Sequence, residues 1–483
     1  MEKETNTVAH KVPSLLSALV VLIIDVAILM LSVTVFDLEI QMALIICCVI
    51  TGIYAFILGF KWDEIQQMMM DGVYSMLIAT FILLLIGGVI ATWIASGTIP
   101  YIIYIGLKLI NPKIFLLCAC LAASFMSIAC GSSWSSAGTV GIAFMGIGAG
   151  LGINPAMTAG AIVSGAYFGD KQSPFSDTTN LAAAMAETSL FDHMRSMMWS
   201  TVPAYLCTLV AYTLLGFVGV GSETDTSAAD VYLEELSKNF NLGIWLLIPV
   251  LVLLYVIIKK APAIPGLVVS IALGVVFAMI FQHETLLQVL GECFNGFKID
   301  SGSDEIDSLL NRGGISSMLW TVCLYFSACV LGQMLHVTGT LEVILAKIAA
   351  VTKSAKTLIP TTLLTSFCMC ALTGSLESSM LITSRLYGPA YDRLGLERRV
   401  LSRSLEDAGT MMCALIPWNS NGMFMATTLG VATVSYIPFA FLGLLTPIFS
   451  LLLAFTGIGV FYVDGRHLKN KKNKKKDVNN DQE

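Results

Sequence analysis

The sequence predicts an all-α membrane protein with many spans, built from two related sets of helices that polar breaks interrupt. Three observations support this prediction. Hydrophobic residues make up 56% of the chain and charged residues only 12%, about half the charged share of a soluble protein. Apolar runs of roughly the 20 residues that a spanning helix needs recur along the chain. The two halves also share motifs at a constant spacing. We therefore expect one large domain in a lipid bilayer, with no nucleic-acid partner.

The apolar runs place the expected helices in order. The first run, 15–36, is too long for the core of a signal peptide and is interpreted as an uncleaved span. Full spans are expected at 15–36, 40–60, 75–96, 113–130, 196–220, 242–259, 263–282, 317–337, 356–372 and 435–462. Shorter pieces, many broken by Gly or Pro, lie at 98–110, 138–152, 156–168, 379–390, 400–416 and 423–433. The number of crossings is then on the order of ten to twelve.

Polar stretches divide these runs into segments. We expect a cytoplasmic N-terminal tail (1–14), a transmembrane hairpin (15–64), a first transmembrane repeat (65–220), a polar loop (221–241), connecting transmembrane helices (242–282), a polar surface segment (283–316), a second repeat (317–462) and a basic tail (463–483). The lysine-rich stretch 469–476 places the C-terminus in the cytoplasm by the positive-inside rule. The expected location is the cell membrane.

The cysteines indicate neither disulfides nor a zinc site. No CxxC pair occurs, and most of the twelve cysteines lie inside apolar runs, where a free cysteine behaves as a small hydrophobe. The spans also hold no His-bearing metal motif and no Ser/His pair that would indicate a membrane enzyme. We therefore expect no cofactor and no enzymatic activity.

The two halves align at an offset of 243 residues. GSSWSS at 131–136 then faces GSLESS at 374–379, LGI at 151–153 faces LGL at 394–396, and PFSDT at 174–178 faces PWNSN at 417–421. At an offset of 242, SGT at 96–98 faces TGT at 338–340. Because the matches occur in the same order, they indicate a structural duplication.

The duplicated motifs interrupt apolar runs with a Gly/Ser tip and later with a proline among Ser, Thr, Asn and Asp. A broken helix in the bilayer core needs protein or a cavity to satisfy its free backbone groups. Paired breaks in two repeats are typical of a transport site near the midplane. Oxygen ligands of this kind suit a hard cation such as Na⁺. The alternative, that the serines only allow close helix packing, is weaker for two such motifs than for one.

The same motifs carry a resemblance to a known family. The stretches 131–153, 164–182 (SGAYFGDKQSPFSDTTNLA), 401–410 (LSRSLEDAGT) and 415–431 (LIPWNSNGMFMATTLGV) resemble the signatures of the NhaC family of Na⁺/H⁺ antiporters. The resemblance covers roughly residues 65–462. It implies two inverted repeats with broken helices, re-entrant hairpins and alternating access.

The resemblance also implies what is transported. The expected function is exchange of Na⁺ for H⁺ across the cytoplasmic membrane, with these two ions as partners. The alternative is a Na⁺- or H⁺-coupled exchanger of organic acids, of the malate/lactate type, or an amino acid transporter, so a small carboxylate is a further candidate partner. A homodimer is compatible with the resemblance, although no residue indicates one.

Candidate ligands in the first repeat surround the break at Pro174. A charge at the bilayer centre costs at least ~2.5–3.5 kcal/mol, so a carboxylate there indicates function. Asp177 is the first choice for the group that holds Na⁺ and H⁺ in turn. Asp170 is the second choice, because the adjacent Lys171 suggests a water boundary. The expected ion- or substrate-binding residues of this repeat are Ser132, Ser133, Asp170, Ser173, Ser176, Asp177, Thr178, Thr179 and Asn180. The Na⁺ candidates are Asp177, Ser176, Thr178 and Asn419.

The second repeat contributes three more acids. Glu377 occupies the hairpin tip where the first repeat has Trp134. Arg403 and Asp407 are four residues apart on one helix face, where they can pair. Such a partner would hold Asp407 ionised, leaving Glu406 or Glu377 as the residue that titrates. The expected binding residues here are Ser375, Glu377, Ser378, Glu406, Asp407, Asn419 and Asn421.

Five arginines of the second repeat have no counterpart in the first: Arg385, Arg393, Arg398, Arg399 and Arg403. They fit a cytoplasmic connection enriched in positive charge. The alternative is an anion site, because arginine binds carboxylates with two parallel hydrogen bonds. The organic-acid function would gain if Arg393, Arg398 or Arg399 reached the transport site.

Overall fold

The computed structural model describes residues 10–36, 38–74, 76–219, 226–259, 262–303, 306–307, 310–350, 352–463 and 465. The predictions for residues 1–9 of the N-terminal tail and for nearly all of the basic C-terminal tail concern residues outside this description.

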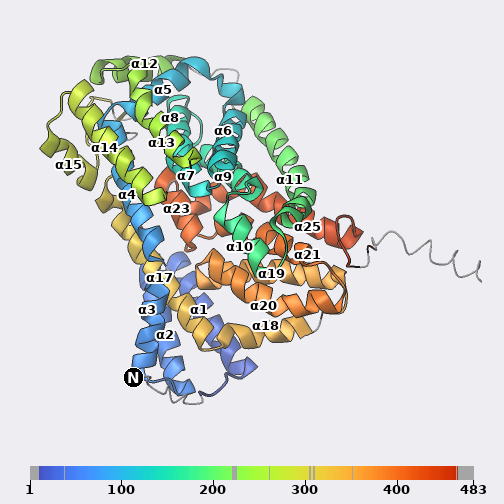
Figure 1. The fold of residues 1–483 in the computed structure, drawn as a ribbon. Coiled ribbons are helices and arrows are strands. Elements are labelled where there is room, and N and C mark those ends of the chain that lie inside the picture. Colours follow the sequence, from blue (N-terminus) through green and yellow to red (C-terminus); the bar gives the residue numbers. More distant parts are fainter. Residues whose placement is uncertain are drawn as a thin grey trace, which may run out of the picture.

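The described chain is helical, which confirms the predicted all-α membrane fold (Figure 1). The first half contains α1 (Leu15–Thr34), α2 (Ile40–Leu58), α3 (Trp62–Tyr74), α4 (Leu77–Ala95), α5 (Thr98–Leu109), η1 (Pro112–Ile114), α6 (Phe115–Cys130), α7 (Ser133–Ser136), η2 (Ala137–Gly141), α8 (Ile142–Gly150), α9 (Pro155–Gln172), α10 (Asp177–Met185) and α11 (Leu190–Gly219).

The second half begins with α12 (Thr226–Asn239), η3 (Ile244–Leu247), α13 (Ile248–Ile258), α14 (Ala263–Phe281) and α15 (Leu286–Asn295). It continues with η4 (Ile315–Met318), α17 (Leu319–Val337), α18 (Thr340–Ala350), α19 (Ala355–Thr373), α20 (Leu376–Arg393), α21 (Arg398–Ser404), η5 (Leu405–Thr410), α22 (Met411–Cys413), α23 (Ser420–Leu429), α24 (Thr433–Tyr436), η6 (Ile437–Phe439) and α25 (Phe441–Thr456).

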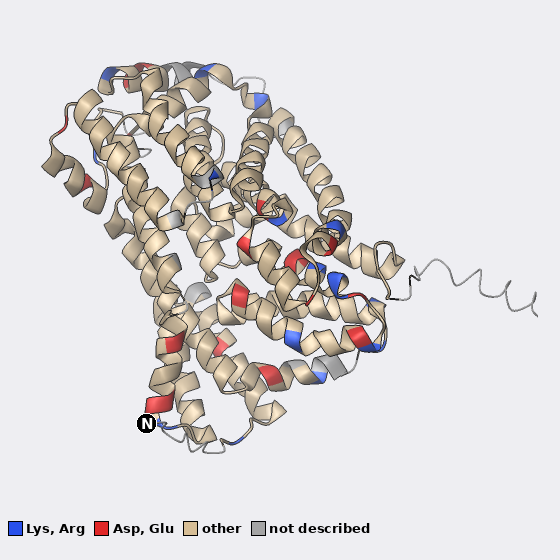
Figure 2. Cartoon of the chain, viewed as in Figure 1, with Lys and Arg blue, Asp and Glu red and all other residues tan. Residues whose placement is uncertain are grey.

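Within the described residues, seven helices are long and apolar enough to cross a membrane, or up to ten if each bent pair counts as one span. The bent pairs include α4 with α5, at 69°, and α23 with the segment after it, at 87°. Charged residues are sparse along the helices, and one group lies where α9, α10 and α21 approach one another (Figure 2). A low density of charge with broken helices is the pattern expected of a transporter.

The structure confirms the duplication at the predicted positions. Gly131 and Gly374 end α6 and α19 in the left-handed conformation, with φ of 69° and 64°. The serines that follow them, Ser132 and Ser375, cap α7 and α20 by accepting a hydrogen bond from a backbone N–H three residues on. A glycine with positive φ followed by a serine cap lets one helix end and the next begin without a long loop.

The second break is duplicated as well. Ser176 caps α10 and Asn419 caps α23, again 243 residues apart. The SGT and TGT motifs form the same turn: the hydroxyls of Ser96 and Thr98 lie 2.8 Å apart, and those of Thr338 and Thr340 lie 2.7 Å apart. The weak sequence matches therefore reflect equivalent backbone breaks.

The packing indicates that the duplication also includes two helical hairpins, each of which precedes one of the expected repeats. The segment α1–α3 packs on α17 of the second half through α2 and α3, whereas α14 and α15 pack on α4 of the first half. Each half therefore holds a helix hairpin against the other. Residues 296–314, between α15 and η4, have no counterpart in the first half, where only two residues separate α3 from α4.

Part of the expected surface segment 283–316 forms α15, which buries Val289 and Cys293 and exposes Leu286 and Leu287. Two expectations about local structure are wrong. Residues 226–239 of the expected polar loop form α12, because Leu236 and its apolar neighbours give one buried helix face beside the acidic residues. The expected span 435–462 is not one helix, because η6, which contains Pro438, separates α24 from α25.

Candidate functional site

A cavity of about 660 Å³ lies between the two hairpin tips and is the candidate transport site. Its walls include residues from both tips, from the start of α23, from α4 and from α13 and α14. Three carboxylates line it, Asp170, Asp177 and Glu377, and no lysine or arginine among the described residues does. A cavity with acidic and hydroxyl-bearing walls favours a cation over an anion. We refer to it below as the acidic cavity.

Asp170 is the enclosed carboxylate of this cavity. It lies in the last turn of α9 and is only 3% exposed. The hydroxyl of Ser133, at the first hairpin tip, donates to Oδ2 at 2.8 Å, and the hydroxyl of Ser176, which caps α10, donates to Oδ1 at 2.5 Å. Asp170 therefore joins the two breaks of the first repeat.

Asp177 is the more exposed of the two aspartates. It begins α10 and lines the acidic cavity at a position open to water. The reason given from sequence for preferring Asp177, that Lys171 places Asp170 at a water boundary, is wrong. Lys171 is wholly buried and pairs with Asp407 of the second repeat. Asp170 thus has the surroundings that were expected of Asp177.

The second repeat contributes polar groups to the opposite wall. Ser375 donates to Oε2 of Glu377 at 2.7 Å, and Glu377 itself is exposed. Oδ1 of Asn421 accepts hydrogen bonds from Nε1 of Trp134 and from the hydroxyl of Tyr167, both at 2.8 Å. Trp134 also stacks on Phe424, with ring centroids 4.1 Å apart. These contacts hold the first hairpin tip against α23.

Several of the predicted ligands form hydrogen bonds with backbone groups and do not face the cavity. Ser173 donates to the carbonyl of Ile128, Asn180 donates to the carbonyls of Pro174 and Ser176, and Thr179 donates to the carbonyls of Asp170 and Lys171. Asn419 donates to the carbonyl of Cys370, and its Oδ1 accepts from the backbone of Asn421 at 3.0 Å. None of these four lines the acidic cavity. The predicted ligands that do are Ser132, Ser133, Asp170, Asp177, Thr178, Ser375, Glu377, Ser378 and Asn421.

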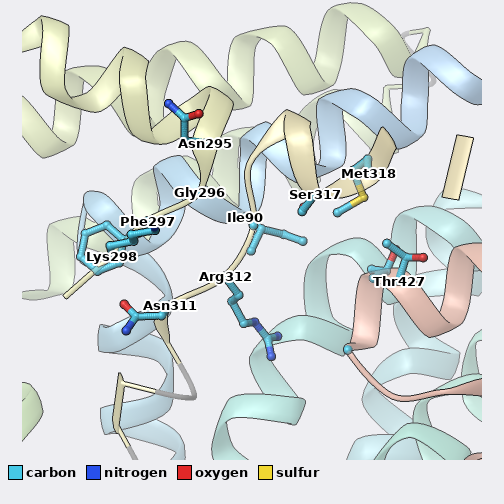
Figure 3. A pocket seen from close by; sticks show the side chains of 13 residues that line it. Ile90, Asn295, Gly296, Phe297, Lys298, Asn311, Arg312, Ser317, Met318 and Thr427 are labelled. Carbon is cyan, nitrogen blue, oxygen red and sulfur yellow. The ribbon is translucent and has the colours of Figure 1, made fainter. Parts of the chain in front are cut away.

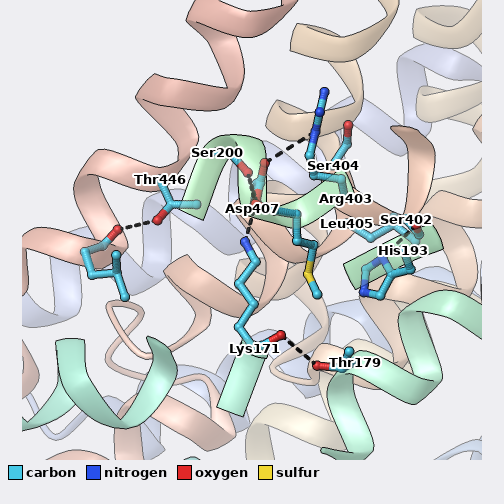
Figure 4. A network of polar contacts seen from close by, with 12 residues as sticks. Lys171, Thr179, His193, Ser200, Ser402, Arg403, Ser404, Leu405, Asp407 and Thr446 are labelled. Atoms are coloured by element: carbon cyan, nitrogen blue, oxygen red, sulfur yellow. Dashed lines mark hydrogen bonds and ion pairs between the residues drawn. The ribbon is translucent and has the colours of Figure 1, made fainter. Parts of the chain in front are cut away.

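A buried charge cluster joins Lys171, which follows Asp170 in the chain, to Asp407 and Arg403 (Figure 4). Oδ1 of Asp407 accepts from Lys171 and, at 2.9 Å, from the hydroxyl of Ser200. Nε of Arg403 is 3.9 Å from Oδ2 of Asp407, which confirms the pair predicted from their helical spacing. Arg403 also donates to the carbonyl of Gly459 at 2.8 Å. Asp407 is therefore a shared counter-ion for two buried cations.

Glu406 is the buried acid without such partners. It is 0% exposed in the π-helical turn η5, and neither carboxylate oxygen has a hydrogen-bond partner among the described residues. It lies within electrostatic range of Lys171 and Asp170. Burial without hydrogen-bond partners makes the ionised form of a carboxyl group costly. π-helical turns often occur at functional sites because they re-aim side chains.

Comparison with known proteins identifies the family. Residues 165–458 match the model of the Na⁺/H⁺ antiporter family. The chain belongs to this family. It is 36% identical to a malate-2H⁺/Na⁺-lactate antiporter of Bacillus subtilis (96% of this chain, 99% of that protein) and 36% identical to the Na⁺/H⁺ antiporter NhaC of Alkalihalophilus pseudofirmus (92% and 96%).

One further sequence relative and one solved structure are also similar to the chain. The chain is 35% identical to the arginine/ornithine antiporter ArcD of Halobacterium salinarum, over 94% of each protein. Among solved structures, MtrF of Neisseria gonorrhoeae, described as one of a class of antimetabolite efflux pumps, has a TM-score of 0.39 and 12% identity over 94% of this chain and 97% of its own. The family is thus established by the sequence relatives, which carry antiporter names with different cargoes.

The arginines considered from sequence as an anion site do not lie at the acidic cavity, and three of them bind other groups. Arg398 binds Asp392 with two hydrogen bonds, at 2.8 and 2.6 Å, and Arg399 pairs with Glu397 at 2.7 Å. Arg393 donates to the carbonyl of Thr352, and Arg385 is exposed. None of them lines the acidic cavity. Their contacts give no support to a carboxylate site at these positions.

Three residues of the site were not recognised from sequence: Lys171 as a buried cation, Ser200 and Tyr167. Lys171 follows an aspartate in a polar stretch, which is also the pattern of a solvated loop. Ser200 lies within an apolar helix and matches no motif, and Tyr167, although inside the stretch 164–182, was not among the residues predicted for the site. For Trp134 a signal existed, because it faces Glu377 in the aligned repeats, but its partner Asn421 did not follow from the alignment.

Proposed function

We propose that this protein exchanges Na⁺ for H⁺ across the cell membrane by alternating access, with Asp170 as the carboxylate that holds the two ions in turn. The observation that carries the proposal is the enclosure of Asp170, with two hydroxyl partners, in a cavity whose charged lining residues, among those described, are all acids. The relatives named as Na⁺/H⁺ antiporters support the choice of ions.

Exchange follows from the chemistry of a carboxylate with two hydroxyl neighbours. With no ion bound, the hydroxyls of Ser133 and Ser176 donate to ionised Asp170. A hydroxyl is both donor and acceptor, so it can rotate and offer a lone pair to Na⁺. A proton on Asp170 removes the charge that attracts Na⁺, and bound Na⁺ disfavours protonation. The two ions therefore exclude one another at one site.

The buried charge cluster keeps this site attractive to a cation. Lys171 is adjacent to Asp170 in the chain, and an unpaired ammonium there would repel Na⁺. Asp407 neutralises Lys171 and connects α9 to η5 of the other repeat. Glu406, which lacks hydrogen-bond partners in the described structure, is the second candidate for carrying a proton. Exchange in this form needs no cofactor and no enzymatic step.

The proposal also includes the placement of the protein. We propose the cell membrane as its location, with the C-terminus in the cytoplasm, on the basis of the lysine-rich tail. Alternating access would expose the acidic cavity to each side in turn through movement of the hairpin tips.

A second candidate function is exchange of organic acids coupled to Na⁺ or H⁺. It is favoured by the 36% identity to the malate-2H⁺/Na⁺-lactate antiporter over 96% of this chain. The acidic cavity would then hold the coupling ion, and the acid would need a basic site elsewhere.

One experiment separates the two candidates. Everted membrane vesicles are loaded with an acid-inside gradient, and a fluorescent dye reports their internal pH. NaCl is added first and, in a separate sample, potassium malate or lactate without sodium. Rapid alkalinisation by NaCl, absent from vesicles without the protein, supports Na⁺/H⁺ exchange. No response to sodium, together with transport of a carboxylate, would reject it in favour of the second candidate.

A further inference from the structure

A second cavity has the opposite electrostatic character. It has a volume of about 400 Å³ and lies where residues 295–298 and 311–313 meet α4, η4 and the end of α23 (Figure 3). Arg312 and Lys298 line it, and no aspartate or glutamate of the described residues does. We refer to it as the basic cavity. A partly open cavity whose charged lining residues, among those described, are both cations favours an anion.

The backbone around Arg312 is fixed by close contacts. Gly313 and Gly314, which follow it, have φ of 82° and 87°, a conformation that glycine adopts readily. The N–H of Gly314 donates to the carbonyl of Gly87 in α4 at 2.7 Å, and the carbonyl of Arg312 accepts from Phe297 at 3.3 Å. The side chain is thus presented from a segment anchored on α4.

The guanidinium of Arg312 has no counter-ion among the described residues. The residue is half-buried, yet its side chain has no ion pair and no hydrogen bond with any residue that the structure describes. By contrast, Arg398 pairs with Asp392, and Arg403 is 3.9 Å from a carboxylate oxygen of Asp407. Partial burial of an arginine with no partner is unfavourable unless water or an anion occupies the space beside it.

Thr428 provides an independent observation in the same cavity. Its side chain is 1% exposed, it lines the basic cavity, and its hydroxyl has no hydrogen-bond partner in the described part of the chain. A buried hydroxyl is normally paired, and leaving one unpaired costs about 1–3 kcal/mol. Its neighbour Thr427, in contrast, bonds Thr321 at 2.7 Å. Thr428 is therefore an unpaired polar side chain in the wall of the cavity that Arg312 also lines.

The basic cavity is connected to the acidic one through α23. Ser420 and Asn421, at the start of this ten-residue helix, line the acidic cavity, and Thr428, near its end, lines the basic one. A helix of this length spans about 15 Å. Nη1 of Arg312 lies 3.5 Å from where a Cβ on Gly430, the C-cap of α23, would stand. Both cavities therefore contact one short rigid element.

We propose that the basic cavity binds a small carboxylate anion, with Arg312 holding a carboxylate by two parallel hydrogen bonds, Lys298 neutralising further charge, and Thr428 donating its hydroxyl. The volume suits a molecule of a few carbon atoms, such as a dicarboxylate. This assignment is independent of Na⁺/H⁺ exchange at Asp170, and it supplies the basic site that the second candidate function requires. Arg312 lies outside the five arginines that the alignment of the repeats singled out.

The test is a binding titration of the purified full-length protein in detergent, by calorimetry. Choline malate is the probe, choline phosphate is a separate arm, and choline chloride is the blank. We expect saturable malate binding that Arg312→Gln weakens by about 10- to 100-fold, the loss expected for a hydrogen bond to a charged group. Arg385→Gln, at an exposed arginine outside the cavity, is the matched control and should bind as the wild type does.

Three outcomes would overturn the assignment: no saturable malate binding to the wild type, equal binding by Arg312→Gln, or saturable binding of phosphate alone. Should Arg312→Gln not fold, Lys298→Gln decides, because Lys298 is exposed and its replacement should weaken malate binding several-fold without disturbing the core. Sodium-driven exchange in chloride medium is measured separately on the same variants. It should persist, because neither residue contacts the acidic cavity, so failure of this site and failure of Na⁺/H⁺ exchange are distinguishable.

Discussion

Nε1 of Trp134 donates a hydrogen bond to Oδ1 of Asn421 at 2.8 Å, and this contact ties the first hairpin tip to the helix that follows the second break. The two residues are 287 positions apart in the chain. Oδ1 of Asn421 also accepts a hydrogen bond from the hydroxyl of Tyr167, so one amide oxygen binds both α9 and the first hairpin tip. The acidic cavity is bounded by this junction.

Replacing Trp134 by Phe should remove the hydrogen bond but keep the stacking on Phe424. We expect the free energy of unfolding to fall by about 1 kcal/mol, the net value of such a bond, and sodium-driven exchange to slow. Trp134→Ala, which also loses the stacking, should be the more damaging of the two. Thermal unfolding in detergent and the vesicle assay measure the effects. Identical stabilities for the two variants would show that the ring contact contributes nothing.

Replacing Asp170 by Asn should abolish sodium-driven exchange, because an amide cannot alternate between Na⁺ and a proton. Asp177→Asn should retain exchange at a reduced rate, since Asp177 lies at the exposed edge of the cavity. Asp71→Asn, at an exposed aspartate in α3, is the control. Vesicles with equal amounts of each variant give the comparison. Full activity of Asp170→Asn, or complete loss in Asp177→Asn alone, would restore Asp177 as the central carboxylate.

Replacing Lys171 by Met should destabilise the protein strongly, because it leaves Asp407 buried with only Ser200 and the more distant Arg403. Removing one partner of a buried pair costs about 3–5 kcal/mol. The comparison is Lys238→Met, which breaks an exposed pair with Glu235 and should cost at most about 1 kcal/mol. Chemical unfolding in detergent measures both. Similar losses for the two variants would mean that the buried pair has no special weight.

Replacing Gly131 by Ala tests the close approach of the two breaks in the first repeat. An added Cβ would lie 2.7 Å from the carbonyl carbon of Phe175, in a residue whose φ is already positive. Gly152 has nearly the same φ, 66°, but nothing within 4 Å of an added Cβ. Gly152→Ala should therefore cost only the strain of the left-handed conformation, about 1–2 kcal/mol. Gly131→Ala should cost more and slow exchange, and equal costs would show that the hairpin tip can shift freely.

Replacing Glu284 by Gln should change the dependence of stability on pH. Burial and the nearby negative charge of Glu292 raise the pKa of Glu284 to about 8, from an ordinary value of 4.5. Between these values the folded state holds a proton that the unfolded state has lost, so stability falls as the pH rises through this window. The variant avoids that loss. It should melt with the wild type at pH 4.5 and above it at pH 9, whereas Glu234→Gln, at an exposed site, should match the wild type at both.

The sequence was most informative where structure depends on neighbours in the chain. Runs of apolar residues predicted the helices, and Gly–Ser and proline breaks predicted the caps at Gly131, Ser176 and their counterparts. The pair of Arg403 with Asp407 followed from a spacing of four residues. Amphipathic α12 was missed, because its acidic residues were weighed more heavily than its buried face.

The sequence alone thus determined the membrane fold, the duplication and the polar breaks, because hydropathy and backbone conformation are properties of short segments. Only the tertiary structure decided that Asp170 rather than Asp177 is enclosed, that Lys171 is neutralised by Asp407, 236 residues away, and that Arg312 lines a separate cavity. The burial of a charged side chain and its partner depend on which distant helices pack around it. That packing is shared among many weak contacts, and no single motif encodes it.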